Sequence, residues 1–396
     1  MKYNFDEIVN RRNTQGSYSL KWNQAPQLAE RFGVSHIKND VIPMFTADMD
    51  FRSAPPIIEA LQEVVNHGIF GYSSFTDAPS YNNAIIGWFK RRMGWEIKPD
   101  ELIYFPGTVE AIKQTILAFT EPGDGVIIQR PVYPPFAHVI NDTNRVVINN
   151  QLIENNGRYT IGFDDLESKA KDPKTKLFIL CSPHNPIGRI WTKEELIELA
   201  RICKKHDVIV ASDEVHGDLI RKNAVFYPLA ALVDNSNVIT MTAANKTFNL
   251  AGLHCTNLVV QNPQIRAKLV KSTKFVLPSP FAIAAVRAAY NECEEWLDDL
   301  LEYIDGNIDW SLKFLREHMP KVKCSRPEAT YILWMDFRDY GLSSEEIHTR
   351  IYKKASVFLD SGQNYDPEYG AGYERICLPS PRGVVEEAFK RIASQF

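Results

Sequence analysis

Five polar side chains in the middle of the chain follow short apolar runs. Tyr133 lies in RPVYPPF, Asn185 in SPHNPIGR, Asp213 and His216 in SDEVHGDL, and Lys246 in NKTFNLAGL. A lysine amine can form a Schiff base with a carbonyl group and can carry a proton. A carboxylate beside a ring nitrogen favours the protonated form of that nitrogen. Each residue alone has an ordinary structural explanation, such as a cap, a turn or a surface position, so only the ordered set indicates chemistry.

A separate segment, PGTVEAI at 106–112, has the pattern of a phosphate site. It supplies a glycine turn between an apolar run and a helical pattern. The backbone N–H groups at a helix N-terminus bind anions, so Gly107, Thr108 and Val109 are the predicted cradle.

The elements that must position these residues are seven predicted strands rich in branched apolar side chains. Several are almost continuously apolar, and helical patterns such as KEELIELARICKKHD separate some of them. This alternation predicts an α/β fold with a mostly parallel sheet, which binds ligands at the carboxyl ends of its strands. The strands are expected to begin near residues 102, 125, 145, 176, 208, 237 and 256.

After residue 279 a long helical stretch precedes a smaller mixed segment. Because 396 residues exceed the size of one core, we expect two domains. We expect their boundary to fall inside that helical stretch, where the character of the sequence changes. The predicted division is a segment at 1–48 that packs with the small domain, a large domain at 49–290 and a small α+β domain at 291–396.

The composition excludes several classes of protein. Forty-nine acidic residues against 45 basic ones give a net charge of −4, which offers no footprint for nucleic acid or an anionic membrane. The six cysteines are scattered, the nine histidines lack ligand spacing, and we expect no metal site. The polar N-terminus and the lack of a long apolar run favour a cytoplasmic protein. P-loop, serine-hydrolase, zincin and dinucleotide-binding motifs are missing in their standard forms.

Taken together, the motifs resemble fold type I enzymes that use pyridoxal 5'-phosphate (PLP), within the class I/II aminotransferase family. The resemblance extends over nearly the whole chain and is closest to the MalY/PatB-type cystathionine β-lyases, or C–S lyases. Matching segments are ADMDF at 47, HGIFGY at 67, FPGTVEAI at 105, SPHNPIGR at 182, SDEVHGDL at 212, NKTFNLAGL at 245 and RICLPSPR at 375.

The resemblance implies a role for each residue around the cofactor. Lys246 would hold PLP as a Schiff base, with Asn245 beside it, and Asp213 would keep the pyridine nitrogen protonated so that the ring accepts electrons. Asn185 and His216 would address the 3-oxygen of the ring, and Tyr133 would stack on it.

The resemblance also implies where the amino-acid substrate binds. Arg375 would hold the α-carboxylate with two parallel N–H donors, and Arg382 is the weaker candidate. The backbone at Ala47 and Asp48 would close over that carboxylate. Tyr72 would reach the phosphate in the partner subunit, which makes a homodimer with shared active sites the expected assembly.

Three departures from the family pattern are visible. Ala243, Ala244 and Asn245 precede the lysine where related enzymes often carry hydroxyl groups. His254 stands where many aminotransferases place an arginine on the phosphate, which disfavours an ordinary aminotransferase. Cys377 replaces the usual asparagine after Arg375, with a consequence that the sequence does not predict.

The function that the resemblance implies is α,β-elimination on S-substituted cysteines, which converts L-cystathionine to homocysteine, pyruvate and ammonia. Two alternatives stay open at this point. One is a PLP-dependent aminotransferase, which would need a keto acid acceptor. The other is a protein of this fold whose main role is to bind a regulator.

Overall fold

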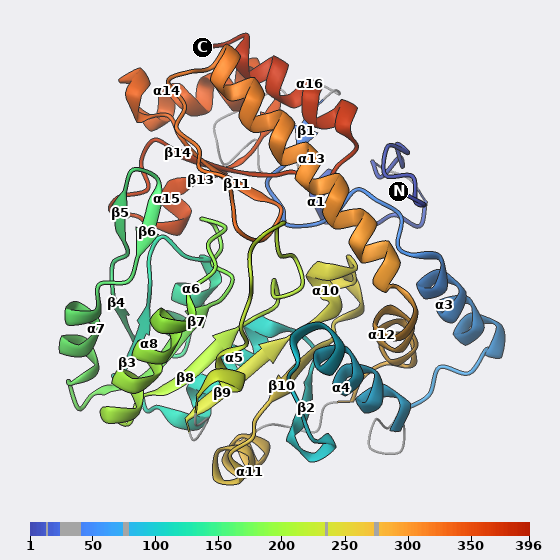
Figure 1. Cartoon of the computed structure of the whole chain (residues 1–396), viewed down its shortest axis with the longest axis vertical. Coiled ribbons are helices and arrows are strands. Elements are labelled where there is room, and N and C mark those ends of the chain that lie inside the picture. The colour runs from blue at the N-terminus through green and yellow to red at the C-terminus, as the bar shows by residue number, and fades with distance from the viewer. Residues whose placement is uncertain (13–14, 24–40, 74–78, 234–236, 273–276) are drawn as a thin grey trace.

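The computed structural model describes the chain except residues 13–14, 24–40, 74–78, 234–236 and 273–276 (Figure 1). A sheet of seven strands fills the lower half of the view and contains all seven predicted strands, so the predicted α/β class is confirmed. Its order is β2 (Leu102–Phe105), β10 (Thr256–Val259), β9 (Val238–Thr242), β8 (Ile209–Asp213), β7 (Thr175–Cys181), β3 (Gly125–Ile128) and β4 (Val146–Asn149).

The sheet is mostly parallel. Only β10 runs antiparallel to its neighbours, and the strands from β9 to β4 pair in parallel. Helices cover both faces, which explains why the strands are apolar along their whole length. On one face lie α5 (Thr108–Phe119), α6 (Pro135–Asp142) and α11 (Pro263–Ser272); on the other lie α7 (Phe163–Ala170), α8 (Lys193–Lys205) and α9 (Leu229–Leu232).

The predicted helix KEELIELARICKKHD is α8, and its sequence explains its start. The Thr192 side chain accepts a hydrogen bond from the Glu195 amide, and the Glu195 side chain accepts one from the Thr192 amide. This capping box satisfies two backbone donors that have no partner inside the helix. The helix buries Leu196, Leu199 and Cys203 against the sheet.

The C-terminal elements form the upper half of the view in Figure 1. Here β14 (Tyr373–Cys377) lies between β11 (Ile332–Asp336) and β13 (Asp360–Ser361) in an antiparallel sheet. A parallel pair joins β1 (Ile42–Pro43) to β12 (Val357–Phe358), so the N-terminal part of the chain contributes a strand here. This region also contains a 3-10 helix (Arg338–Tyr340), α14 (Ser344–His348), a π-helical segment (Thr349–Lys354), α15 (Gly362–Tyr365) and α16 (Arg382–Ala393).

The helical stretch predicted after residue 279 is two helices rather than one. α12 (Pro280–Glu292) ends and α13 (Glu294–His318) begins on either side of Cys293. Glu294 and Glu295 open the second helix, where carboxylates favour a helix N-terminus through its dipole. The exact domain boundaries at 48/49 and 290/291 stay a prediction.

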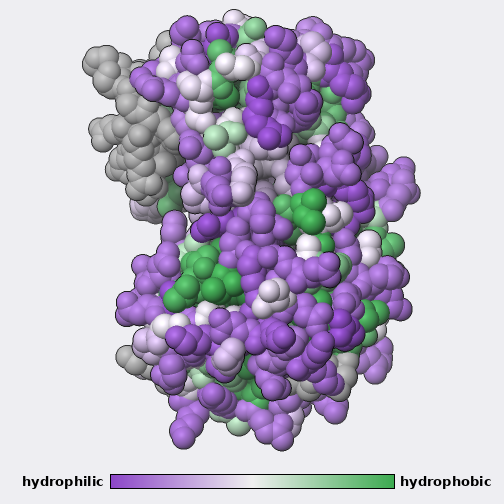
Figure 2. All heavy atoms as spheres, turned by 90° about the vertical axis from the view of Figure 1, so that its left-hand side faces the viewer, coloured by the Kyte–Doolittle hydropathy of each residue, from purple (hydrophilic) through white to green (hydrophobic). Residues whose placement is uncertain are grey.

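Elements of the first hundred residues pack around α12. They are α3 (Pro55–His67) and α4 (Pro79–Met93), preceded by the short α1 (Leu20–Asn23). A hairpin of β5 (Ile153–Asn155) and β6 (Arg158–Thr160) and the turn α10 (Ala244–Thr247) complete the fold. The molecular face in Figure 2 is largely hydrophilic, with separate small hydrophobic patches. Within the described ranges, no helix combines the length and apolarity that crossing a bilayer requires.

Candidate active site

The predicted residues gather at one edge of the sheet. Asp213 is the last residue of β8, Asn185 follows β7, and Lys246 lies in α10, directly after β9. Since these three strands are parallel neighbours, their carboxyl ends meet at the same edge. The structure therefore brings together residues that are 61 positions apart in the chain, from 185 to 246.

Lys246 is half-buried, and its amine donates a hydrogen bond to the carbonyl oxygen of Ala47 at 2.9 Å. Burial lowers the pKa of Lys246, and the positive charge of Arg375 lowers it further against opposing negative groups. A lower pKa increases the fraction of neutral amine, which is the form that attacks a carbonyl or accepts a proton.

Asp213 and His216 lie buried beside the lysine. Burial raises the pKa of Asp213 to about 6, and the hydrogen bond from the Val215 amide, 3.3 Å long, and the Lys246 charge oppose this only in part. Burial, followed by the charges of Lys246 and Arg375, lowers the pKa of His216 to about 3. The Nδ1 atom of His216 has no hydrogen-bond partner among the described residues. The buried Asp213 carboxylate has few groups that stabilise its charge, so it suits a partner with a protonated ring nitrogen. The unpartnered nitrogen of the His216 imidazole suits an oxygen on the same ring.

Arg375 approaches the same edge from β14. Its Nη1 atom donates to Asn185 Oδ1 at 3.3 Å, and its Nη2 atom donates to the carbonyl oxygen of Phe45. Because the carbonyl of the Asn185 amide faces Arg375, its NH₂ group stays available as a donor to another acceptor. The buried Nε atom of Arg375 has no partner among the described residues.

Asp360 is a neighbour of Arg375 that sequence reasoning missed. Its Oδ2 atom lies 3.3 Å from Arg375 Nη2 and accepts a 2.5 Å hydrogen bond from the Tyr365 hydroxyl. The Arg375 guanidinium also lies over the Tyr365 ring, 5.1 Å from its centroid. These contacts hold the guanidinium in place; no motif in the sequence signals Asp360.

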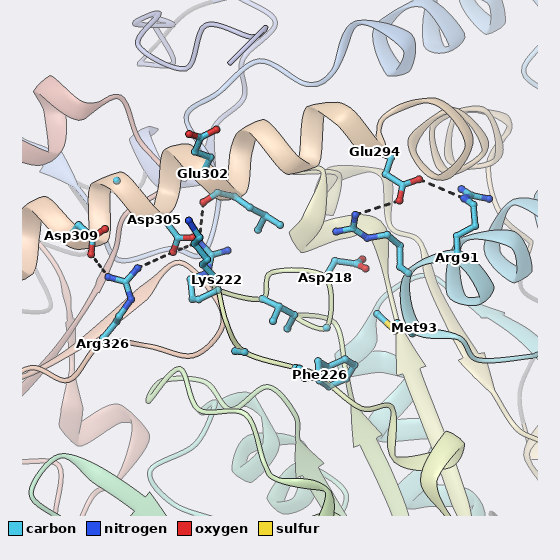
Figure 3. A pocket seen from close by; sticks show the side chains of 18 residues that line it. Arg91, Met93, Asp218, Lys222, Phe226, Glu294, Glu302, Asp305, Asp309 and Arg326 are labelled. Atoms are coloured by element: carbon cyan, nitrogen blue, oxygen red, sulfur yellow. Dashed lines mark hydrogen bonds and ion pairs between the residues drawn. The ribbon is translucent and has the colours of Figure 1, made fainter.

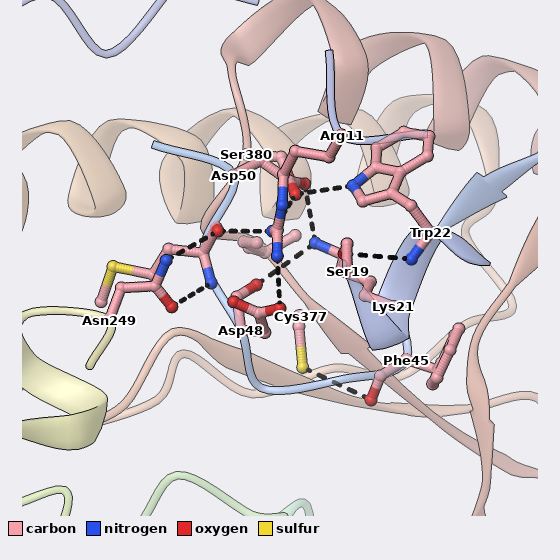
Figure 4. A network of polar contacts seen from close by, with 12 residues as sticks. Arg11, Ser19, Lys21, Trp22, Phe45, Asp48, Asp50, Asn249, Cys377 and Ser380 are labelled. Atoms are coloured by element: carbon pink, nitrogen blue, oxygen red, sulfur yellow. Dashed lines mark hydrogen bonds and ion pairs between the residues drawn. The ribbon is translucent and has the colours of Figure 1, made fainter. Parts of the chain in front are cut away.

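The loop at 47–50 is fixed to the lysine turn by Asn249. The Asn249 amide accepts a hydrogen bond from Met49 N at 3.1 Å and donates one to Met49 O at 3.0 Å (Figure 4). Asn249 adopts a left-handed backbone conformation with φ 57°, which asparagine tolerates better than most residues. The carbonyl oxygen of Ala47, which accepts from Lys246, therefore sits on a loop held directly by a residue three positions after the lysine.

A buried network anchors the other side of this loop. Asp50 Oδ1 accepts from Arg11 Nη1 at 2.7 Å and Trp22 Nε1 at 2.9 Å, and Asp50 Oδ2 accepts from Lys21 Nζ and Ser380 Oγ, each at 2.7 Å (Figure 4). Burial alone would raise the pKa of Asp50, but the Lys21 ammonium and these hydrogen bonds hold it below its ordinary value. Lys21 is itself fully buried, so the two charges depend on each other.

Asp48 and Cys377 border the same network. Asp48 Oδ2 lies 2.7 Å from Arg11 Nη2, and the Cys377 thiol is buried next to the carbonyl oxygen of Phe45. Burial raises the pKa of Cys377, so its thiol stays protonated at neutral pH. The structure thus places Cys377 on the strand that carries Arg375, facing the loop between Phe45 and Asp50.

The predicted phosphate cradle lies at the start of α5. Gly107 precedes the helix, Thr108 is its first residue, and the Thr108 hydroxyl lies 3.1 Å from the Thr256 hydroxyl of β10. The first amides of α5 have no partners inside the helix, which suits an anion. Val109 is partly exposed there.

Tyr133 is half-buried at the same edge and packs edge-on against Phe136. Burial, followed by the charge of Asp213, raises the pKa of Tyr133, which keeps its hydroxyl neutral. Asn245 is half-buried with its Oδ1 atom unpartnered among the described residues.

The structure does not bring every named residue into this cluster. The Tyr72 side chain is fully exposed in the single chain, and His254 is exposed at the end of a short helical turn. Arg382 instead donates from Nε to Asn307 Oδ1 at 2.6 Å on α13, which commits its guanidinium to packing between α16 and α13.

Comparisons with known proteins find relatives over nearly the whole chain. The family model for class I and II aminotransferases matches residues 39–392. The chain is 41% identical over 394 residues to cystathionine beta-lyase PatB of Bacillus subtilis, covering 98% of each chain. It is 29% identical to Protein MalY of Escherichia coli, over 97% of this chain and 96% of that one. The crystal structure of cystalysin from Treponema denticola, which contains a pyridoxal 5'-phosphate cofactor, matches with a TM-score of 0.93 and 34% identity over 100% of this chain and 99% of that chain.

Proposed function

This chain belongs to the class I and II aminotransferase family, and we propose that it is a PLP-dependent carbon–sulfur lyase acting on S-substituted cysteines such as L-cystathionine. The observation that carries the proposal is the likeness to cystathionine beta-lyase PatB over nearly the full length of both chains. The products would be homocysteine, pyruvate and ammonia, with one water consumed.

The residues at the sheet edge fit the cofactor. Asp213 would pair with the pyridine nitrogen, and His216 Nδ1 and the Asn185 amide would serve the ring oxygen. The amides of Gly107, Thr108 and Val109 would receive the phosphate. When bound, PLP supplies an electron sink for the carbanion that forms at the substrate Cα.

The chain's own groups would then orient the substrate and move its protons. Arg375, held by Asn185 and Asp360, binds the substrate α-carboxylate and so fixes the Cα–H bond. The Lys246 amine, with its pKa lowered by burial, takes the Cα proton, and the carbonyl oxygen of Ala47 orients that amine. A thiol leaves as a thiolate without a dedicated acid because its pKa is about 8.5.

We further propose a homodimer. Ile69, Phe70 and Tyr72 have exposed side chains on the connection between α3 and α4, which suits contact with a second copy. Tyr72 would then complete the phosphate site of the partner subunit. We propose a cytoplasmic location because all six cysteines are free thiols, which persist in reducing compartments.

One assay tests the reaction type. Purified holoenzyme is incubated with L-cystathionine without any keto acid, and pyruvate and free thiol are measured together. We expect both products in equal amounts. Product formation that requires an added keto acid would instead identify an aminotransferase and refute the lyase proposal.

A further inference from the structure

A cavity of about 910 Å³ lies between α13 and the loop at residues 217–226, away from the sheet edge that holds Lys246 (Figure 3). Charged side chains of both signs line it, and Arg326 pairs there with Asp305 and Asp309 (Figure 3). The proposed reaction uses none of these side chains. An adjoining cavity of about 450 Å³ shares Arg221, Lys222 and Arg326.

Arg221 is the unusual member of this set. Only 1% of its side chain is exposed, yet its Nε and Nη2 atoms have no hydrogen-bond partner among the described residues. Its Nη1 atom makes a 3.4 Å hydrogen bond to Leu301 O and lies 3.6 Å from Asp305 Oδ1. Leaving two donors of a buried cation unpaired is costly, so such a group normally has a partner.

The charges around Arg221 do not balance it. Asp305 is its nearest carboxylate, and Arg326 Nη2 lies closer to the same carboxylate, at 3.3 Å. Arg326 also pairs with Asp309, while Lys222 is exposed and has no ion pair in the part of the chain that the structure describes. Arg221 therefore shares Asp305 with Arg326 and is the more distant of the two cations, which leaves its charge only partly compensated.

The two free donors also have a definite geometry. Nε–H and Nη2–H point in parallel from one edge of the guanidinium, and this pair of donors matches the two oxygens of a carboxylate. We propose that this cavity is a second ligand site, in which Arg221 binds the carboxylate group of a small organic acid. Lys222 and Arg326 would add electrostatic attraction at its rim.

The site is connected to the catalytic lysine through one loop. Asp218 lines the cavity and accepts hydrogen bonds from Trp88 Nε1 and from the hydroxyl of Thr247, each at 2.9 Å. Thr247 is the neighbour of Lys246, and the same loop follows His216 and strand β8, which ends at Asp213. A carboxylate bound at Arg221 is thus positioned to alter the turn that carries Lys246 without competing for Arg375.

The test is calorimetric titration of the holoenzyme with acetate, followed by the same titration with inorganic phosphate. Acetate should bind the wild type in the millimolar range, and Arg221→Gln should weaken this binding at least about tenfold. Arg375→Lys should keep it, because that variant alters only the proposed substrate site. Arg201→Gln, which removes an exposed arginine on α8, is the charge-matched control and should leave the titration unchanged.

If Arg221→Gln fails to fold, Arg221→Lys and the exposed Lys222→Gln replace it. Arg221→Lys should weaken acetate binding because an ammonium cannot offer two parallel donors, and Lys222→Gln should weaken it less. The proposal is overturned if the wild type binds no acetate, if both Arg221 variants bind it as the wild type does, or if Arg375→Lys alone removes it. Tighter binding of phosphate than of acetate at Arg221 would overturn the carboxylate assignment.

Discussion

Replacing Asp213 by Asn should stabilise the cofactor-free protein. The same substitution should remove most of the activity of the protein with cofactor bound. Asp213 is buried, and burial raises its pKa from 3.8 to about 6. A raised carboxyl pKa means that the native state binds more protons than the unfolded state between these two values. The native state therefore loses stability as the pH rises through this window, and the loss is complete above pH 6.

The size of this loss follows from the shift. About two pKa units correspond to about 3 kcal/mol at pH 8, and about half of that is already lost at pH 5. Asparagine has nearly the same shape and no charge, so it avoids the cost. The apoprotein of Asp213→Asn should be more stable than the wild-type apoprotein, and the difference should be about twice as large at pH 8 as at pH 5.

Thermal unfolding of cofactor-free protein, followed by circular dichroism at both pH values, measures this difference. Asp142→Asn, which changes an exposed carboxylate at the end of α6, is the control and should shift the midpoint little at either pH. With cofactor bound, the wild type should be more stable than Asp213→Asn. Turnover of the variant should fall about 10²- to 10³-fold, which is the usual effect of removing a group that stabilises charge in the transition state. The reasoning is refuted if the variant apoprotein is no more stable at pH 8, or if its advantage does not depend on pH.

The remaining predictions concern the substrate, the dimer and the loop. Arg375→Lys should raise KM about 30-fold for every amino-acid substrate, because a single ammonium replaces two parallel donors. Arg382→Lys should leave KM unchanged. Steady-state kinetics measures both variants, and an exchange of these phenotypes would refute the assignment of Arg375. Mixing inactive Tyr72→Ala and Lys246→Ala proteins under subunit exchange should restore part of the activity, and no recovery despite proven exchange would place Tyr72 outside the partner's site. Asn249→Ala should lower kcat about tenfold and change the pH profile of kcat, since the loop that orients the lysine amine loses both hydrogen bonds between Asn249 and Met49. A wild-type pH profile would show that these two hydrogen bonds have only a structural role.

The sequence predicted the central sheet well, and the reason is physical. Strands covered by helices on both faces must be apolar along their length. This pattern can be recognised in the sequence without knowing which strands or helices lie beside each strand. The positions of Asn185, Asp213 and Lys246 were predictable for a related reason, because parallel strands deliver their following residues to one edge. Their roles toward the cofactor came from the family resemblance and stay predictions.

The break at Cys293 was harder to predict because apolar periodicity continues across it. α12 and α13 each keep a buried face, and no glycine or proline separates them. Only the two glutamates after Cys293 hint at a new helix start, and acidic residues are common in helix interiors as well.

The charged network at Asp50 shows a different limit of sequence reasoning. A lysine and an aspartate 29 positions apart carry no signal of pairing, since both residue types are normally exposed. In the fold, the Lys21 ammonium is tolerable only because Asp50 accepts from it, and Asp50 is tolerable only because Arg11, Trp22 and Ser380 donate to it as well. The network thereby ties the N-terminal segment to the loop whose Ala47 carbonyl contacts Lys246. Such a buried arrangement adds little to the free energy of unfolding compared with an apolar core. Its role here is to position the loop, and through the Ala47 carbonyl it fixes the position of the Lys246 amine.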